Sequence, residues 1–381
     1  MKALHLIKTT IGATWALKEI EVLISLGCSV HVVLPSNTGL ASKYSSAGAI
    51  VHVVNFNFMT GNLLRVLAEL IKLRKLVSEI KPDIIHSHFV GTTLFMRMAM
   101  IFCKIPRVFQ VPGPLHLENK LTRSVEILSA NSSDYWIATC ARTSRYYLEA
   151  GVASARIRTI FYGTDVSLFS ADVNESLRNE LGLGPDVAII GMVAYVYPPK
   201  RWLGQRRGIK GHEDLIDAVA LVLKHRPNTV CVFVGGAWGD SRQYFEEVVR
   251  YSSKELGAKG IFLGSRNDVA RIYGGFDLVV HPSHSENLGG AGESLLMAVP
   301  TLATNVGGFP DIVVDGLTGW LVEPGDPEEM AIKIQEVLSD PVEARKRANA
   351  GRALVLESLD VKKTGEKVLE FYLEIIGRSN A

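Results

Sequence analysis

The densest group of reactive side chains lies in the segment from His281 to Asp311. A strand pattern ends at His281, a polar loop with Glu286 follows, and a glycine-rich stretch leads into a helix pattern that carries Glu293. The glycines are Gly289, Gly290 and Gly292. Glycines at a helix start let a ligand approach bare N–H groups, where the helix dipole favours an anion. A carboxylate one turn into the helix can accept hydrogen bonds from hydroxyl groups. The segment therefore predicts a phosphate-binding site, with a tight strand-to-helix turn and a capping acid as the alternative.

A second candidate group comprises His86 and His88, which end a strand pattern in Asp83-Ile-Ile-His-Ser-His. Two histidines at this spacing could bind a metal. No carboxylate or cysteine cluster accompanies them in the sequence. We therefore favour a structural or substrate-lining role and expect no metal site here.

Both groups belong to an alternation of short β-branched runs and helical stretches, which predicts parallel α/β sheets. Continuous apolar strands such as 230–234 are typical of parallel strands that are covered on both faces. The expected strands are 3–7, 29–34, 50–55, 83–88, 107–111, 135–139, 158–161, 187–193, 229–234, 260–263, 278–281 and 301–303. The expected helices are 14–26, 62–80, 92–103, 121–130, 142–150, 212–225, 241–256, 269–274, 291–298 and 327–338, with a helical tail over 344–379.

The length of 381 residues suits two domains better than one. Periodicity lapses over 167–174, so we expect one domain at 1–168 and a second at 169–355. A C-terminal helix over 356–381 is expected to pack back on the first domain. Open parallel sheets bind ligands beyond the carboxyl ends of their strands, and two such domains facing each other would form a central cleft.

The composition is that of an ordinary globular protein, with a net charge of +2. This charge argues against a nucleic-acid-binding protein. The four cysteines are widely spaced without a CxxC pair, which predicts reduced structural thiols. Neither a signal peptide nor an uncharged apolar run of about 18 residues is present, so we expect a cytoplasmic protein. The apolar stripe over 92–108 is interpreted as a core helix or, alternatively, as a peripheral contact with the inner membrane surface.

Several ordered motifs resemble glycosyltransferase family 4, the retaining enzymes of the GT-B fold also called glycosyl transferases group 1. The segment from His281 is similar to the donor-site signature of this family. It is followed by Pro300-Thr-Leu-Ala-Thr-Asn-Val-Gly-Gly-Phe-Pro-Asp and by Asp315-Gly-Leu-Thr-Gly-Trp-Leu-Val, which resemble the next family motifs. The resemblance covers nearly the whole chain and is strongest over 191–324. It implies an α/β fold of two Rossmann-like domains with parallel sheets facing a central cleft.

The resemblance implies a donor site in the second domain. Glu293 matches the second family glutamate, which implies hydrogen bonds to the donor ribose. The first family glutamate would fall on Ser285, one residue before Glu286. We expect Glu286 to approach the donor sugar. Backbone contacts to the sugar and diphosphate are expected from Asn287, Leu288, Gly289 and Gly290.

The basic residues of the second domain are expected to contact the donor phosphates. Lys210, in Lys-Gly-His-Glu at a helix start, resembles the family lysine that offsets charge on the leaving diphosphate. The family arginine is missing, because Ala194 and Tyr195 occupy its place. Arg266 either contacts the base or a phosphate or caps a surface turn. A basic loop either substitutes for the missing arginine or is simply solvated; its candidates are Lys200, Arg201, Arg206 and Arg207.

In the first domain the resemblance implies contacts on the other side of the reaction. Gly12 follows the first strand, where the family has a glycine-rich loop against the donor phosphates. His116 resembles the acceptor-side histidine near the donor sugar. His86, His88 and Glu118 are also expected on the acceptor side, with capping of the following helix as the alternative for Glu118.

The resemblance predicts a hexosyltransferase (EC 2.4) that moves a hexose-type sugar from a nucleotide sugar, expected to be UDP-linked, to a hydroxyl of a saccharide or lipid-linked acceptor. Polysaccharide or glycoconjugate biosynthesis is the expected context. The catalytic residues would be His116, Lys210 and Glu286, with retention by front-face attack, no cofactor and no metal. The alternatives are a hydrolysing sugar-nucleotide epimerase and a non-catalytic sugar-nucleotide-binding protein. The oligomeric state stays open.

Overall fold

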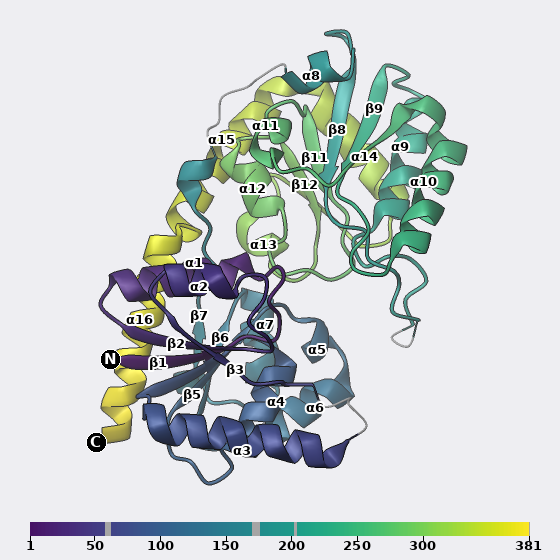
Figure 1. Ribbon diagram of the computed structural model, residues 1–381. Coiled ribbons are helices and arrows are strands. Elements are labelled where there is room, and N and C mark those ends of the chain that lie inside the picture. The colour runs from purple at the N-terminus through teal and green to yellow at the C-terminus, as the bar shows by residue number, and fades with distance from the viewer. Residues whose placement is uncertain (58–61, 170–175, 202–203, 381) are drawn as a thin grey trace. The chain divides into compact units, whose positions relative to one another are not determined.

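The computed structural model describes residues 1–57, 62–169, 176–201 and 204–380, and the chain divides into two compact units (Figure 1). Unit 1 comprises Met1–Asp165 and Ser358–Ala381, and unit 2 comprises Val166–Glu357. The domain boundary expected from the sequence lies between residues 168 and 169. The part of the expected linker from 170 to 174 lies outside the described residues.

Unit 1 is built on a parallel seven-stranded sheet in the order β3-β2-β1-β4-β5-β6-β7. Its strands are β1 (Lys2–Leu6), β2 (Ser29–Leu34), β3 (Ile50–Val53), β4 (Ile84–Ser87), β5 (Arg107–Val111), β6 (Asp134–Ala138) and β7 (Ile157–Thr159). Its helices are α1 (Thr14–Ser25), α2 (Ala41–Ser46), α3 (Leu63–Ile80), α4 (Val90–Ala99), α5 (Leu115–Glu118), α6 (Lys120–Leu128), α7 (Ala141–Glu149) and α16 (Val361–Asn380), with the 3-10 turn η1 (Ser154–Arg156).

Unit 2 is built on a parallel six-stranded sheet in the order β10-β9-β8-β11-β12-β13. Its strands are β8 (Ala188–Val193), β9 (Thr229–Val234), β10 (Gly260–Gly264), β11 (Leu278–His281), β12 (Thr301–Thr304) and β13 (Trp320–Val322). Its helices are α8 (Ser176–Glu180), α9 (His212–Leu223), α10 (Arg242–Leu256), α11 (Val269–Tyr273), α12 (Ala291–Leu296), α13 (Phe309–Ile312), α14 (Pro327–Ser339) and α15 (Pro341–Ser358), with 3-10 turns η2 (Val166–Leu168) and η4 (Gly257–Lys259).

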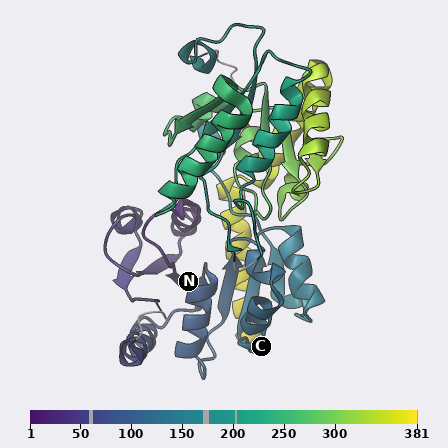
Figure 2. The same ribbon diagram turned by 90° about the vertical axis from the view of Figure 1, so that its right-hand side faces the viewer.

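Helices cover both faces of each sheet, as the two views show (Figure 1, Figure 2). In β8 the side chain of Ile190 packs with α9, α10 and α14, whereas its neighbour Ile189 packs with α8 and α11. In β1 of unit 1, Ala3 packs with α1 and α16, and Leu4 packs with α3 and α4. Successive side chains of a strand point to opposite faces, so strands buried on both faces must be apolar throughout. The continuous apolar runs in the sequence have this origin.

All twelve expected strands are present, with ends shifted by no more than two residues. The structure adds β13 and the short helices α2, α5, α8 and α13, which are too brief to show a clear period. The expected helical tail is wrong as a single element, because it divides into α15 and α16. The break lies at Asp360, whose carboxylate accepts a hydrogen bond from the Lys362 N–H at 2.9 Å and so starts a new helix.

The apolar stripe over 92–108 is largely a core helix. Phe95, Met96 and Met100 are buried, while Met98 and Phe102 are exposed. Arg97, on the same helix, is also buried, because its guanidinium pairs with Glu126 and Asp134 at 2.9 and 3.1 Å. The core interpretation is therefore confirmed for α4. Among the described helices, none combines the length and apolar character that crossing a membrane requires.

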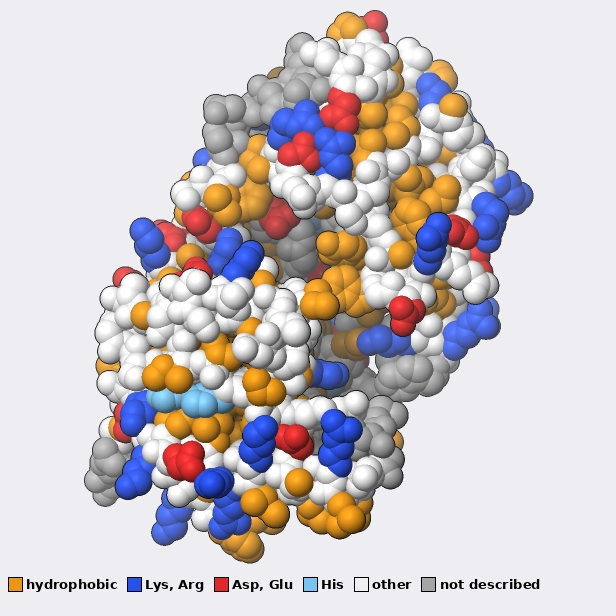
Figure 3. Space-filling model, viewed as in Figure 1, with side chains coloured by type: hydrophobic (Ala, Val, Ile, Leu, Met, Phe, Trp, Pro, Cys, Tyr) orange, Lys and Arg blue, Asp and Glu red, His pale blue; other side chains and the backbone are white. Residues whose placement is uncertain are grey.

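The state of the cysteines and the distribution of surface charge are as expected from the sequence. Cys28, Cys140 and Cys231 are buried and Cys103 is half-buried, and all four are free thiols, as expected. On the face shown in Figure 3, lysine and arginine side chains are interspersed with acidic ones and form no continuous basic stripe.

Candidate active site

A pocket of about 310 Å³ lies in unit 2 at the carboxyl ends of β8 and β11. These two strands are adjacent in the sheet, although β9 and β10 follow β8 in the chain and lie on its other side. The pocket thus lies at the switch point of an open parallel sheet, where such folds bind ligands. Six residues predicted for the donor site line it: Lys210, Arg266, Glu286, Gly289, Gly290 and Glu293.

Lys210 reaches this pocket because the start of α9 packs closely against the loop after β11. Gly211 has a left-handed φ of 73°, and a Cβ on it would lie 2.0 Å from the carbonyl oxygen of Pro282. The His284 N–H donates to the Ile209 carbonyl at 2.8 Å across the same junction. Only glycine combines this conformation with such a close approach. The Lys-Gly pair is thereby fixed beside the loop that carries Glu286.

Lys210 and Glu286 form an ion pair inside the pocket, between the lysine Nζ and the glutamate Oε2. The Lys210 ammonium also lies 5.7 Å from the centre of the Tyr197 ring, within range of a cation–π interaction. Burial, and then the charge of Glu286, raises the pKa of Tyr197 to about 12. The Lys210 ammonium is therefore held between the Glu286 carboxylate and the Tyr197 ring. An incoming anion could take the place of the carboxylate as its partner.

The Glu286 loop is shaped by close backbone contacts. The Asn287 N–H donates to Glu286 Oε1 at 3.1 Å, and the Gly308 N–H donates to the Asn287 carbonyl at 2.9 Å. A Cβ on Gly307 would lie 1.6 Å from the Glu286 carbonyl oxygen. Of the two residues considered for the first family glutamate, Glu286 lines the pocket and Ser285 is not among its lining residues. Glu286 therefore lies at the pocket, and its approach to the donor sugar stays a prediction.

Glu293 lies in the first turn of α12 and also lines the pocket. Close to it lies the buried Tyr273, whose hydroxyl donates to the Gly290 carbonyl at 3.3 Å and whose pKa is raised first by burial and then by Glu293. His281 also lines the pocket, and its Nε2 lies 3.1 Å from Ser294 Oγ. Burial, together with the charge of Lys210, lowers the pKa of His281 to about 3, so this imidazole is neutral near pH 7. His281 therefore supports the turn as an uncharged hydrogen-bonding group.

The remaining backbone positions have mixed placements. Gly289 and Gly290 line the pocket, whereas Asn287 and Leu288 are not among its lining residues. The Asn287 carbonyl already accepts from Gly308, and the Leu288 side chain is buried. Tyr197 and Phe309 also line the pocket and were not among the predicted site residues. Tyr197 lies four residues beyond the end of β8, and this closeness to a strand end is the one feature of the sequence that could have indicated a role in the site.

Arg266 lines the pocket, but its guanidinium is paired with acids. It bonds Glu180 at 2.7 Å and Asp268 at 2.8 Å, and Arg271 bonds the same two carboxylates. These pairs raise the Arg266 pKa, mainly through the hydrogen bonds to Asp268 and Glu180. Any contact with a nucleotide would therefore begin from a guanidinium that is already engaged.

The basic loop does not bring its residues to the pocket lining. Arg201 and Arg206 are exposed, and Lys200 is half-buried with its pKa lowered by burial. Arg207 pairs with Asp214 at 2.6 Å and with Asp217 at 2.7 Å. Arg201 and Arg206 therefore lie in a solvated loop in this structure. Contact of Lys200, Arg201 or Arg206 with the donor diphosphate stays a prediction.

Three predicted residues of unit 1 lie in its loops and short helices. Gly12 has a left-handed φ of 71° in the loop between β1 and α1. His116 lies in α5, with Nε2 at 3.5 Å from the Tyr147 hydroxyl, and burial lowers its pKa to about 4. Glu118 is exposed at the end of α5, and the capping role considered for it belongs to Asn119, whose side chain accepts from two N–H groups of α6. An acceptor role for His116 and Glu118 stays a prediction.

His86 and His88 occupy a different environment from the one expected. Both are fully buried, among His5, Tyr372 and Tyr162 of the same unit. Neither ring is exposed on the surface of unit 1, and the expected acceptor-side role of His86 and His88 stays a prediction. A structural role, which the sequence left open, fits their burial.

The comparisons with known proteins agree with this geometry. The family model described as Glycosyl transferases group 1 matches residues 203–353, and the model described as Glycosyltransferase Family 4 matches residues 13–168. The D-inositol 3-phosphate glycosyltransferase of Segniliparus rotundus is 28% identical over 251 residues, which are 64% of this chain and 52% of that protein. The Thermobispora bispora protein of the same name is 23% identical over 341 residues, which are 84% of this chain and 77% of its own. The chain thus spans about half the length of the first of these relatives.

Solved structures of the same fold cover the chain almost completely. The crystal structure of Anabaena HepE in complex with UDP and glucose has a TM-score of 0.81 at 22% identity, covering 97% of this chain and 98% of that one. The sucrose-phosphate synthase of Thermosynechococcus elongatus has a TM-score of 0.77 at 18% identity, covering 99% and 100%. These likenesses show the GT-B fold, in agreement with the two parallel sheets. Because two glycosyltransferase models match its two halves in chain order, the chain belongs to the GT-B glycosyltransferases, with a Glycosyltransferase Family 4 region followed by a Glycosyl transferases group 1 region.

Proposed function

We propose that the protein is a retaining glycosyltransferase that moves a hexose-type sugar from a UDP-sugar to a hydroxyl of a saccharide or lipid-linked saccharide. The observation that carries this proposal is the unit 2 pocket, which joins one lysine and two glutamates to a glycine-rich turn at the switch point of the sheet. The names of the relatives add support, since HepE was solved with UDP and glucose and the curated relatives are glycosyltransferases.

In this proposal Lys210 leaves its pair with Glu286 when the donor binds and contacts the diphosphate. As the bond between the anomeric carbon and the β-phosphate oxygen breaks, the ammonium offsets the charge that develops on that oxygen. The acceptor hydroxyl oxygen attacks from the same face, and its proton passes to the departing phosphate. The configuration at the anomeric carbon is thereby retained.

The acids of the pocket have supporting roles in this scheme. Among the described lining residues they are Glu286 and Glu293, which lie beside Lys210 and Tyr273 respectively. We assign Glu286 to the donor sugar and Glu293 to the ribose. Lys210 supplies the positive charge that a divalent cation would otherwise provide, so we propose transfer without a metal or cofactor. A lipid-linked acceptor would be met at the inner membrane surface, and peripheral location there belongs to the same proposal.

The proposed function is tested by measuring UDP release from a panel of UDP-sugars with and without saccharide and glycolipid acceptors. We expect release that depends on an acceptor, together with a product whose anomeric configuration by NMR matches that of the donor. Release of UDP with free sugar or an isomerised sugar, independent of acceptor, would instead establish a hydrolysing epimerase. Binding of UDP-sugar without turnover by any acceptor in the panel would favour a non-catalytic binding protein.

Glu293→Gln is expected to weaken UDP binding by about tenfold or more, because a hydrogen bond from a ribose hydroxyl to a charged acceptor contributes about 1.5–3 kcal/mol. Isothermal titration calorimetry with UDP measures this change in the dissociation constant. Glu246→Gln is the matched control, since Glu246 lies on α10 in an exposed pair with Arg242. An unchanged UDP affinity in Glu293→Gln would remove Glu293 from the ribose site.

A further inference from the structure

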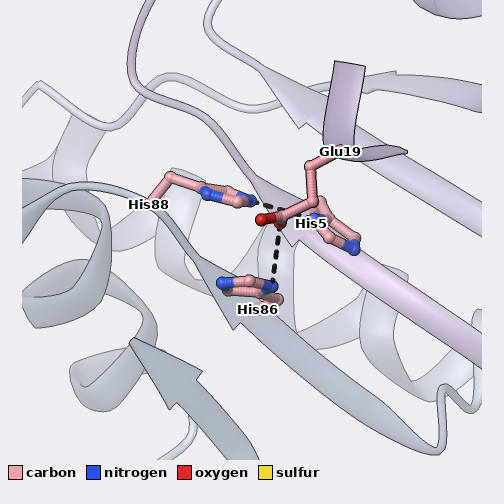
Figure 4. Close-up of side chains that lie close together, drawn as sticks. All are labelled: His5, Glu19, His86 and His88. Atoms are coloured by element: carbon pink, nitrogen blue, oxygen red, sulfur yellow. Dashed lines mark hydrogen bonds and ion pairs between the residues drawn. The ribbon is translucent and has the colours of Figure 1, made fainter. Parts of the chain in front are cut away.

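Unit 1 contains a buried cluster of three imidazoles and one carboxylate, formed by His5, Glu19, His86 and His88 (Figure 4). His5 lies in β1, His86 in β4, His88 just beyond β4, and Glu19 in α1. One potential ligand atom from each residue lies within 4.8 Å of the others. Figure 4 shows the Glu19 carboxylate pointing toward the histidine rings. No pattern in the sequence indicates a carboxylate at this place, because Glu19 is separated from His86 by more than sixty residues.

The polar atoms of this cluster are incompletely paired. Glu19 is 2% exposed, and its Oε1 accepts no hydrogen bond of normal geometry. His86 Nδ1 lies 3.9 Å away, and the buried amide of Gln110 is the other polar group beside the carboxylate. His86 Nε2, also buried, is unpartnered as well. Burial raises the pKa of Glu19 to about 8 and lowers the pKa of His5 to about 3. A buried polar group without a partner costs about 1–3 kcal/mol, so such a gathering indicates a ligand, such as a bound ion.

We propose that His5, Glu19, His86 and His88 form a structural site for a divalent transition metal, with Zn²⁺ as the favoured ion. Neutral imidazoles and a carboxylate are the nitrogen and oxygen ligands that zinc prefers, and four protein ligands are typical of structural zinc sites. Ligand atoms around a tetrahedral zinc lie about 3.3 Å apart, so the ligand atoms would have to approach by about 1.5 Å. The stacked rings of His86 and His88 would also have to turn until a nitrogen of each faces the ion. The ion would bind the Glu19 oxygen that has no hydrogen-bond partner and would balance the charge of the carboxylate.

Groups around the cluster are suited to orient its ligands. His5 Nδ1 and His88 Nε2 lie 2.9 Å apart and face each other within the cluster. On the opposite side of each ring, His5 Nε2 lies 3.5 Å from the Tyr372 hydroxyl and His88 Nδ1 lies 3.3 Å from the Tyr162 hydroxyl. Ligating histidines usually bond an outer partner through the second nitrogen. Loading the site would open the His5–His88 contact and free His86 Nδ1 from its hydrogen bond with Tyr372.

The consequence of metal binding would be stabilisation of unit 1. The ligands come from β1, α1 and β4, and Tyr372 belongs to α16, the helix that packs beside α1. An ion would therefore connect the first strand and helix of the chain to the C-terminal helix through the outer tyrosine. This site is separate from the pocket of unit 2, and it concerns folding and not the transfer step.

The test begins with the full chain purified without chelator, and then dialysed against EDTA and titrated with ZnCl₂. We expect about one zinc per chain by mass spectrometry of the metal. Zinc at 100 times its dissociation constant should raise the melting temperature of the EDTA-treated protein by about 5 °C. Co²⁺ loading should give the visible absorption of a four-coordinate site. No bound metal, and a melting temperature indifferent to EDTA and ZnCl₂, would overturn the proposal in favour of a hydrogen-bonded network alone.

Variants identify the ligands. Glu19→Gln and His88→Gln should each abolish zinc binding. Tyr372→Phe should weaken zinc binding by about tenfold but still bind about one zinc per chain at saturation. The double variant His31→Gln/His52→Gln is the matched control, because these half-buried histidines of β2 and β3 also face each other at 2.9 Å but are not part of the cluster. Loss of zinc in this control but not in Glu19→Gln would place the metal elsewhere and contradict the assignment.

Discussion

Lys210→Ala is expected to lower kcat/KM for sugar transfer by about 10²- to 10³-fold, the cost of removing one group that stabilises charge in a transition state. The loss should appear mainly in kcat, because the charge on the leaving phosphate grows as the glycosidic bond breaks. Lys210→Arg, which keeps the charge with a different shape, should restore part of the rate. The initial rate of acceptor-dependent UDP release is measured for the unsubstituted protein, Lys210→Ala and Lys210→Arg.

The control for this substitution is Lys346→Ala, which removes a lysine of unit 2 that pairs with Glu343 at the surface of α15. Its rate should equal that of the unsubstituted protein. Removing Lys210 also leaves Glu286 without its ion-pair partner. The double variant Lys210→Ala/Glu286→Gln therefore distinguishes the two effects. Full activity in Lys210→Ala would show that the lysine serves only to pair with Glu286.

Gly307→Ala is expected to destabilise the protein by about 2–5 kcal/mol and to abolish donor binding. Its φ of 53° alone would cost an alanine about 1–2 kcal/mol. The added Cβ would lie 1.6 Å from the Glu286 carbonyl oxygen, so the Glu286 loop must also move, at about 1–3 kcal/mol more. The shift in the urea midpoint measures the stability, and titration with UDP measures the binding.

Gly316→Ala separates backbone strain from the contact with the Glu286 loop. Gly316 has a φ of 74°, and a Cβ on it would meet nothing within 4 Å. This variant should lose only about 1–2 kcal/mol of stability and bind UDP normally. If Gly307→Ala behaved like Gly316→Ala in both measurements, the packing of Gly307 against the Glu286 loop would have no part in shaping the pocket.

The strands could be predicted from the sequence because each is buried on both faces and therefore apolar throughout. The turn at Glu286–Glu293 could be predicted because its glycines and acids lie close together in the chain. Elements without such a pattern were missed: β13 has three residues, and the division between α15 and α16 depends on the single residue Asp360.

The contacts between distant segments could not be predicted. Nothing near His86 in the chain indicates Glu19, which only the pairing of β1 with β4 and the packing of α1 bring to it. The ion pairs of Arg207 and Arg266 are likewise tertiary contacts. Arg207 pairs with Asp214 across a turn, and Arg266 pairs with Glu180, which is far away in the chain. Residue type suggested phosphate ligands at both positions, whereas the tertiary partners already neutralise both guanidinium groups.

A crystal structure of the protein with UDP tests the central assignment most directly. The account predicts the diphosphate within hydrogen-bond distance of Lys210 Nζ, with the Lys210–Glu286 ion pair broken and the ribose hydroxyls at the Glu293 carboxylate. UDP bound away from the carboxyl ends of β8 and β11, or bound there with Lys210 still paired to Glu286, would contradict it.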